Sequence, residues 1–271
     1  MPADMPQDIV SAIEVNDLTK VYRVAVRGNG LGESVKSLIK RKYEERVAVD
    51  KISFKVRHGE VVAFVGPNGA GKTTTLKILS GIIRPTDGDA RVLGCVPWER
   101  RRGFQKRIAM VMGQKAQLWW DLPAQDSFLL QKEIYGIPDA LYKSHLSEWV
   151  DRLSVSDALQ TPLRLLSLGQ RMKMELIGAL LHEPEVLFLD EPTIGLDLLS
   201  QEAIHKFLLE LKARGKTTIL LTSHYVKDVQ VLCDRVIAIR EAKIVFEGSL
   251  SQLSNSGDLE LTLREIYTAS H

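Results

Sequence analysis

Apolar residues along the chain follow two different spacings, and these predict two kinds of element. Short runs of consecutive apolar residues, bounded by turn signals, indicate buried strands. Such runs occur at 61–65, 186–189 and 217–222. Helical spacing follows these runs at 72–80 and near 199–214. Strands that alternate with helices in this way are typical of an α/β fold with a parallel sheet.

Other regions depart from this alternation. The stretch 11–22 alternates apolar and polar residues in the manner of an edge strand, and a turn at His58 and Gly59 joins two further strands. Residues 95–165 have helical spacing and few strand signals, and a short hairpin is indicated at 236–248. We therefore expect an α/β core that is interrupted by one helical segment.

The composition adds a broad class but no chemistry. Of the 271 residues, 45% are apolar and 26% charged, which is the balance of a globular protein. The longest apolar runs fall far short of the ~20 residues of a membrane-spanning helix, and the N-terminus does not resemble a signal peptide. A formal charge of +2 makes no general case for nucleic acid. Cys95 and Cys233 are expected to be isolated core thiols, and the histidines indicate no metal cluster.

The stretch GPNGAGKTT at 66–74 fits the phosphate-loop pattern G-x-x-x-x-G-K-[ST]. Its glycines permit a tight backbone that turns N–H groups toward phosphate oxygens, and the following helix adds its positive N-terminus. Lys72 would reach the β- and γ-phosphates, and the Thr73 hydroxyl would coordinate Mg²⁺. A chance match is the alternative, but an apolar strand before the loop and a helix after it are the context that this motif requires. The expected nucleotide ligands here are Gly66, Asn68, Gly69, Gly71, Lys72, Thr73 and Thr74.

Polar side chains also stand at the carboxyl ends of predicted strands, the edge where α/β sheets bind ligands. Asp190 and Glu191 follow the strand at 186–189, and two adjacent carboxylates there need a cation or proton to balance them. We expect Asp190 to hold Mg²⁺ and Glu191 to orient and deprotonate an attacking water. Gln114 and His224 end other strands, but each taken alone is as consistent with a structural role.

Six motifs in a fixed order make the chain resemble the nucleotide-binding subunit of an ATP-binding cassette (ABC) transporter. They are the phosphate loop at 66–74, Gln114, LSLGQ at 166–170, VLFLDEP at 186–192, GLD at 195–197 and His224. Together these motifs are far more specific than any single one, and the resemblance extends from about residue 12 to 250. It implies an α/β P-loop NTPase core with an inserted α-helical subdomain and an N-terminal antiparallel β subdomain.

The resemblance implies one nucleotide-binding domain, 1–271, with four parts. A RecA-like core with its β subdomain would take about 12–97 and 185–250, and a helical signature subdomain about 98–184. An insertion at 24–46 has a basic amphipathic face, which would touch lipid headgroups or a permease, or would belong to a plain solvated helix. Residues 251–271 would form a C-terminal tail.

Roles for individual residues follow from the same resemblance. Tyr22 would stack on the adenine ring, with an ordinary strand aromatic as the alternative. Gln114 resembles the glutamine that contacts Mg²⁺ and the attacking water, and His224 resembles the histidine that touches the γ-phosphate. Asp197 resembles the aspartate of the loop that crosses the interface between two cassettes.

The signature of this family is resembled by Ser167, Gly169 and Gln170, which would bind the ATP held by a second cassette. Leu168 departs from the family's commoner Leu-Ser-Gly-Gly-Gln form. If position 168 needed φ > 0, leucine would weaken closure of the pair, whereas in a helical conformation it would cost little. We favour the helical conformation.

The implied activity is MgATP hydrolysis coupled to transport. In this family two cassettes pair head to tail on ATP, so the implied partners are a second copy or a related cassette and a separate membrane permease. No nucleic acid is expected, and the implied place is the cytoplasmic face of the inner membrane. Trp119 and Trp120 stand where the family docks its permease, with burial in the helical core as the alternative.

The motif sequences resemble those of cassettes that serve exporters with short, roughly six-helix permeases. An importer ATPase and a soluble ABC ATPase of translation or DNA maintenance remain open. A P-loop kinase or a GTPase is disfavoured, because neither explains the Ser167, Gly169 and Gln170 signature and the guanine-reading motif of a GTPase is absent.

Overall fold

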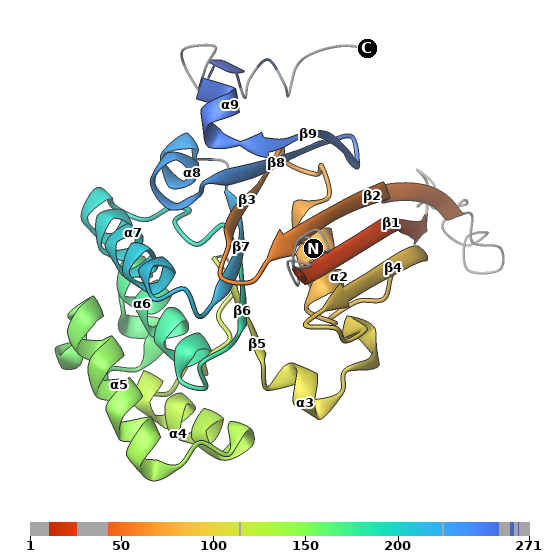
Figure 1. Ribbon diagram of the computed structural model, residues 1–271. Coiled ribbons are helices and arrows are strands. Elements are labelled where there is room, and N and C mark those ends of the chain that lie inside the picture. Colours follow the sequence, from red (N-terminus) through yellow and green to blue (C-terminus); the bar gives the residue numbers. More distant parts are fainter. Residues whose placement is uncertain are drawn as a thin grey trace, which may run out of the picture.

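The computed structural model of the protein describes residues 11–25, 43–113, 115–223, 225–254, 261, 262 and 265. Gln114, His224, most of the expected insertion at 24–46 and most of the tail therefore lie outside the described residues. Two β-sheets organise the rest, with helices packed around the larger of them (Figure 1).

The smaller sheet is antiparallel and has the strand order β2-β1-β4. Its strands are β1 (Ser11–Ala25), β2 (Tyr43–Arg57) and β4 (Asp87–Val92). The expectation of an edge strand at 11–22 was wrong, because β1 is the central strand. Its alternation arises because one face of the sheet is buried and the other is not, and this pattern is the same for edge and central strands.

The larger sheet has the order β5-β6-β7-β3-β8-β9, in which only β9 is antiparallel to its neighbour. Its strands are β5 (Ile108–Met112), β6 (Val186–Asp190), β7 (Thr218–Ser223), β3 (Val61–Val65), β8 (Arg235–Arg240) and β9 (Lys243–Ser249). Strand β5 pairs with β6 although it lies inside the range 98–184 expected to be helical. A five-residue apolar run cannot be told from part of a buried helix by spacing alone.

The two faces of the larger sheet pack against different partners. On β3, Val61, Ala63 and Val65 belong to the core shared with the helices at 124–180 and 198–232, whereas Val62 and Phe64 face the other way. Helix α2 (Lys72–Leu79) fills that second side, between the two sheets (Figure 1). The alternation of a strand buried on both faces thus builds two separate cores on one sheet.

Helices cover the first face of the larger sheet. They are α4 (Ala124–Tyr135), α5 (Asp139–Leu153), α6 (Leu168–Leu180), α7 (Leu198–Ala213) and α8 (Val226–Leu232). The three of them within 98–184, α4 to α6, form the inserted helical block. Shorter turns are α3 (Arg102–Gln105), α9 (Leu250–Ser254) and three 3₁₀ segments, Pro97–Glu99, Ser156–Ala158 and Leu163–Leu165. Within the described residues, none of the helices combines the length and apolar character needed to cross a bilayer.

Candidate functional site

The loop between β3 and α2 has a backbone that side chains would obstruct. Gly71 caps α2 with φ 113°, and a Cβ at this position would lie 2.2 Å from the Ala48 carbonyl oxygen. Both the positive φ and the close approach require glycine. No side chain caps this helix end, so the first N–H groups of α2 point into the loop as anion donors.

Lys72 is buried beneath this loop, with only 5% of its surface exposed. Its ammonium donates to the carbonyl oxygens of Gly66 at 2.6 Å and Pro67 at 3.1 Å. Burial lowers the pKa of Lys72, while the carboxylates of Glu191 and Asp190 act in the opposite direction. The loop therefore holds a positive charge close to two negative ones, and an ammonium with three protons still has donor capacity for a phosphate oxygen.

Asp190 gathers hydroxyl groups at the end of β6. Thr73 Oγ1 lies 3.0 and 2.9 Å from its two carboxylate oxygens, and Thr222 Oγ1 donates to Oδ1 at 2.7 Å. The first residue of the phosphate-loop helix and the end of β6 thus meet. A carboxylate and a hydroxyl side by side are the oxygen donors that Mg²⁺ prefers, so this pair fits the ion.

Glu191 has a strained backbone, with φ 53°. Its N–H lies 3.0 Å from the Thr222 carbonyl oxygen and 3.1 Å from Thr222 Oγ1. A Cβ on Gly113 would lie 2.1 Å from the Glu191 carbonyl oxygen, so the chain just before Gln114 passes close behind it. A left-handed conformation of a non-glycine residue costs free energy that the surrounding contacts offset, and in this molecule it also occurs at Glu183 and Glu241.

These residues open onto a cavity of about 340 Å³ between the loop and the smaller sheet. It is lined by Tyr22, Val24, Arg46, Ala48, Asn68, Gly69, Gly71, Lys72, Thr73, Thr74 and Glu191. The site thus contains Arg46, which sequence reasoning missed. Arg46 could have been found from the pairing of β1 with β2, because it lies directly opposite Tyr22 in that pair of strands.

The LSLGQ motif forms the start of α6 rather than a second open loop. Ser167 is the N-cap: its Oγ accepts from the Gln170 N–H at 3.2 Å, and Gln170 Oε1 accepts from the Ser167 N–H at 3.0 Å. This reciprocal pair is a capping box. Leu168 is the first residue of the helix and is not among the residues with positive φ, in agreement with the favoured helical conformation.

Position 169 requires a glycine because Ser200 packs closely against it. A Cβ on Gly169 would lie 2.1 Å from Ser200 Oγ and 2.7 Å from Ser200 Cβ. Ser200 is held by Asp197, the N-cap of α7, whose carboxylate accepts from the Ser200 N–H at 2.9 Å and from its hydroxyl at 2.7 Å. The hydroxyl bond and then the backbone bond from Ser200 lower the pKa of Asp197. The N-termini of α6 and α7 are therefore packed together.

The structure separates the expected site residues into two groups. Asn68, Gly69, Gly71 and Lys72 to Thr74 of the phosphate loop line one cavity together with Tyr22 and Glu191, and Asp190 lies directly behind Thr73. Gly66 is not among the lining residues, and its carbonyl accepts from Lys72. Ser167, Gly169, Gln170 and Asp197 form a second group that does not line this cavity. Gln114 and His224 lie outside the described residues, so their expected roles stay predictions.

The family comparison agrees with this geometry. The family model described as "ABC transporter" matches residues 49–194, which include the phosphate loop, the LSLGQ helix and the end of β6. The chain belongs to the ABC transporter family. It is similar over most of its length to ATP-binding proteins of such transporters.

Curated relatives come from several bacteria. NatA of Bacillus subtilis, an ABC transporter ATP-binding protein, is 32% identical over 77% of this chain and 85% of its own length. Nod factor export ATP-binding protein I of Paraburkholderia xenovorans is 35% identical over 79% of this chain and 70% of its own. The doxorubicin resistance ATP-binding protein DrrA of Mycobacterium tuberculosis is 36% identical over 78% and 64%.

Solved structures confirm the fold. An ATP-binding subunit of an ABC transporter superposes with TM-score 0.77 at 24% identity, covering 94% of this chain and 99% of its own. A dimeric cassette in a post-hydrolysis state, bound to ADP and Pi, gives 0.73 at 21%, covering 88% and 98%. The predicted P-loop NTPase core of ABC type, with its N-terminal antiparallel sheet and inserted helices, is therefore confirmed.

Proposed function

We propose that the chain is the ATP-binding and ATP-hydrolysing subunit of an ABC exporter, and that two cassettes close head to tail on MgATP to drive a separate permease. The observation that carries this is the division of the site. One chain holds a cavity with a phosphate loop, and the LSLGQ end of α6 stands apart from it, beside Asp197. Each group is half of a site that a second copy, or a related cassette, would complete.

The residues around the cavity have the groups that hydrolysis requires. Lys72 and the N–H groups of Gly69, Gly71, Thr73 and Thr74 would bind the phosphates, with Tyr22 against the adenine. Thr73 and Asp190 would hold Mg²⁺, whose charge offsets that of the phosphates. Glu191 would take the proton of the attacking water. The bonds from its backbone N–H to Thr222 hold the main chain from which its side chain extends.

Gln114 and His224 complete this proposal by sequence position. Gln114 follows Gly113, which lies against Glu191, and would contact Mg²⁺ and the attacking water. His224 follows Ser223 at the end of β7 and would touch the γ-phosphate. Arg46 adds a second cation to the cavity beside Lys72.

The LSLGQ group would bind the γ-phosphate held by the partner cassette. Ser167 offers its hydroxyl, and the first N–H groups of α6 have no carbonyl one turn earlier in the helix to bind. Asp197 stands beside Gly169 and would enter the same interface. Leu168, 38% exposed, is part of the surface that would be buried.

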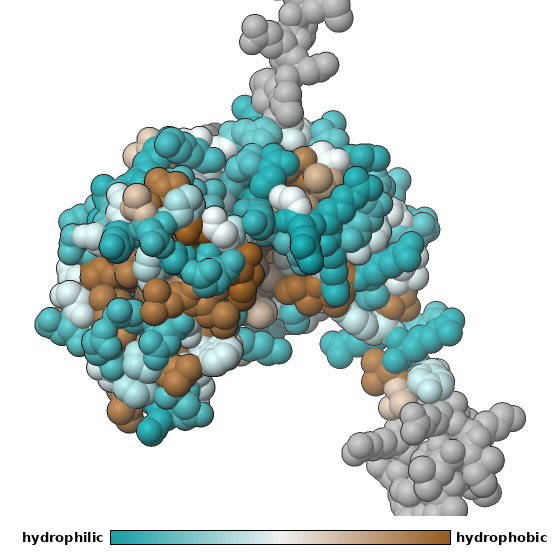
Figure 2. All heavy atoms as spheres, turned by 90° about the horizontal axis from the view of Figure 1, so that it is seen from below, coloured by the Kyte–Doolittle hydropathy of each residue, from teal (hydrophilic) through white to brown (hydrophobic). Residues whose placement is uncertain are grey.

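An apolar surface on the helical block supports a permease partner. Figure 2 shows apolar side chains gathered over the helices at the lower left of Figure 1. Trp119 and Trp120 are 56% and 47% exposed, so burial in the helical core does not explain them, and Arg171 lies over the Trp120 ring at 4.8 Å. Exposed aromatic groups of this kind mark protein interfaces.

Export is favoured over import by the relatives named for drug resistance and Nod factor export. The chain would then work at the cytoplasmic face of the membrane, attached through its permease. An importer ATPase or a soluble ABC ATPase would differ in what it binds, so the proteins that co-purify from detergent-solubilised membranes separate these alternatives. A multi-span permease supports the proposal, and ribosomes or DNA would contradict it.

Glu191→Gln tests the core of the proposal. The variant keeps a side chain of the same shape that cannot accept the proton, so we expect it to bind MgATP, to lose at least about 100-fold in turnover and to accumulate as a dimer. Light scattering with and without MgATP measures the dimer, and phosphate release measures turnover. Lys72→Ala in the Glu191→Gln background is the control that should not dimerise. Turnover at the parent rate would contradict the assignment of Glu191.

A further inference from the structure

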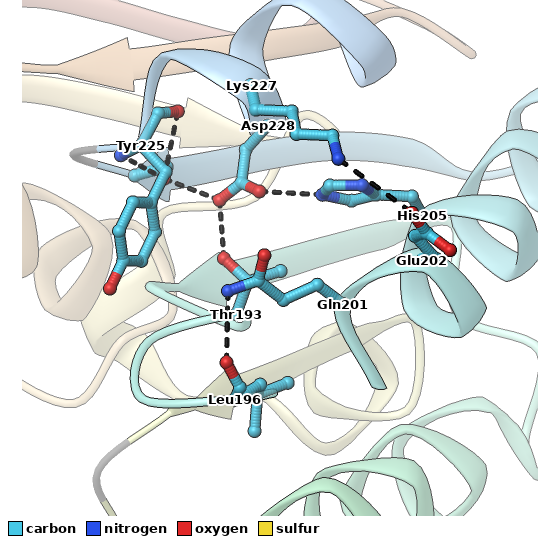
Figure 3. A network of polar contacts seen from close by, with 9 residues as sticks. Thr193, Leu196, Gln201, Glu202, His205, Tyr225, Lys227 and Asp228 are labelled. Atoms are coloured by element: carbon cyan, nitrogen blue, oxygen red, sulfur yellow. Dashed lines mark hydrogen bonds and ion pairs between the residues drawn. The ribbon is translucent and has the colours of Figure 1, made fainter. Parts of the chain in front are cut away.

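One buried carboxylate, that of Asp228, connects the segments on either side of the proposed catalytic residues. Asp228 lies on α8, and only 2% of its surface is exposed. It is not among the residues that line the nucleotide cavity. Figure 3 shows Thr193 and His205 turned toward its carboxylate from two different elements.

Three hydrogen bonds reach this carboxylate from three segments. Thr193, in the loop after β6, donates to Oδ2 at 2.5 Å, and Ser223, the last residue of β7, donates to the same oxygen at 2.6 Å. His205 on α7 lies with Nε2 2.6 Å from Oδ1. Burial raises the pKa of Asp228, but the bonds from His205, Ser223 and Thr193 outweigh it and leave the pKa below its usual value.

The bond to Ser223 organises the turn at the end of β7. A serine hydroxyl has one proton, and the short bond to Asp228 commits it there. The lone pairs of Ser223 Oγ then accept from the Tyr225 N–H at 2.9 Å. Ser223 and Tyr225 are the chain neighbours of His224, so Asp228 fixes the backbone on both sides of that position from outside the cavity.

The same carboxylate brackets Glu191. Thr193 follows Glu191 by two residues, and Thr222, which accepts the Glu191 N–H, directly precedes Ser223. Asp228 therefore restrains the chain after Glu191 and the strand end to which Glu191 is bonded. This restraint acts on a glutamate whose left-handed backbone, with φ 53°, already costs free energy.

We propose that Asp228 is a positioning residue for ATP hydrolysis. It acts through Thr193 and Ser223, and it holds Glu191 and the chain on either side of position 224 in the arrangement that the attack on the γ-phosphate requires. This inference rests on the proposed ATPase function and deepens it. Because Asp228 lies outside the cavity, its loss slows the chemical step and leaves ATP binding intact.

Two substitutions separate the oxygen acceptor from the charge. Asp228→Ala leaves the hydroxyls of Thr193 and Ser223 without their acceptor. Asp228→Asn keeps an oxygen opposite both hydroxyls, and its amide can donate to Nε2 of the other neutral tautomer of His205. We expect kcat to fall about tenfold or more for alanine, because small displacements of reacting groups are costly, and to stay within about threefold of the parent for asparagine.

The measurements are kcat, KM and Kd for ATP on the full chain, with rates referred to the fraction that binds ATP. KM and Kd should stay within about twofold of the parent, because no contact to the nucleotide is removed. Asp234→Ala is the matched control: this nearby aspartate is 76% exposed, is paired with Lys212 at 2.7 Å, and should leave kcat unchanged. If Asp228→Ala does not fold, Ser223→Ala carries the test, with an expected fall in kcat at constant KM.

The proposal is overturned if Asp228→Ala, or Ser223→Ala in its place, has the parent kcat. It is equally overturned if alanine and asparagine reduce kcat alike, or if only KM changes. A parent protein that binds ATP but does not hydrolyse it would instead contradict the proposed function. The failure of the Asp228 proposal is measured on the variants, and the failure of the proposed function is measured on the parent protein, so the two can be distinguished.

Discussion

Two helices of this molecule, α2 and α6, begin at glycine-containing turns, and their N-termini differ in how they are capped and packed. Helix α2 starts at Gly71 with no side-chain cap, above a buried lysine. Helix α6 starts at Ser167 with a capping box that satisfies donors at its own N-terminus. The first end leaves its N–H groups to a ligand held by this chain, and the second is stable without one.

The surroundings of Gly71 and Gly169 explain why the two helix ends differ. Gly71 is required by a positive φ and a backbone oxygen, which shape a cavity inside the fold. Gly169 has no positive φ and is required by Ser200, which packs a second helix end against α6. One glycine therefore shapes a pocket, and the other shapes a surface to which the proposed partner cassette would bind.

The largest expected effect separates the two helix ends by ligand binding. Lys72→Ala removes the buried cation of the first end, and we expect it to abolish ATP-dependent thermal stabilisation. For the parent protein at an ATP concentration 100-fold above Kd, that stabilisation is about 2.7 kcal/mol. Lys77→Ala, on the same helix but not among the cavity residues, is the control. Full stabilisation of Lys72→Ala would contradict the phosphate-loop assignment.

Gly169→Ala tests the second end without touching the first. The added methyl would collide with Ser200, so we expect ATPase activity and MgATP-driven dimerisation to fall about tenfold or more while ATP binding by the monomer persists. Light scattering and thermal shift measure the two properties on one sample. Gly103→Ala is the matched control, because its Cβ would meet no atom within 4 Å. Parallel loss of ATP binding would show that the two ends are not independent.

Arg46→Ala asks how far the first end extends beyond its motif. We expect a loss of about threefold to tenfold in ATP affinity, as for one charged contact that is partly exposed to solvent. Arg23→Ala controls for charge, since Arg23 lies on the facing strand, pairs with Glu45 and is not among the cavity residues. Equal affinities for Arg46→Ala and the parent would exclude Arg46 from the nucleotide site.

The smallest effect concerns Leu168. Because it occupies a helical position, Leu168→Gly should leave ATPase activity within about twofold of the parent and cost about 1 kcal/mol or less of stability. Steady-state phosphate release and thermal unfolding measure both. A large increase in rate would show that closure of the pair requires φ > 0 at this position.

Some elements of the fold are predictable from local sequence, and others depend on the strands with which they pair. The phosphate loop, the helix at 72–80 and the strands at 61–65 and 186–189 were predicted, because local spacing and turn chemistry act over a few residues. Strand β5 was not predicted, since a five-residue apolar run takes its identity from the neighbour with which it pairs. The central place of β1 was missed because strand order depends on pairing and not on alternation.

The sequence by itself determined which chemical groups this protein carries: a phosphate loop, an acid pair and the Ser167, Gly169 and Gln170 signature in one order. Only the tertiary structure decided which of these groups meet. It placed Arg46 in the cavity opposite Tyr22, gave Gly169 its reason in Ser200, and joined Thr193, His205 and Ser223 through Asp228. Apart from the bond between Ser223 and Asp228, which are five residues apart, these contacts link residues far apart along the chain. No local pattern records them, because they form only when the core brings separate elements together.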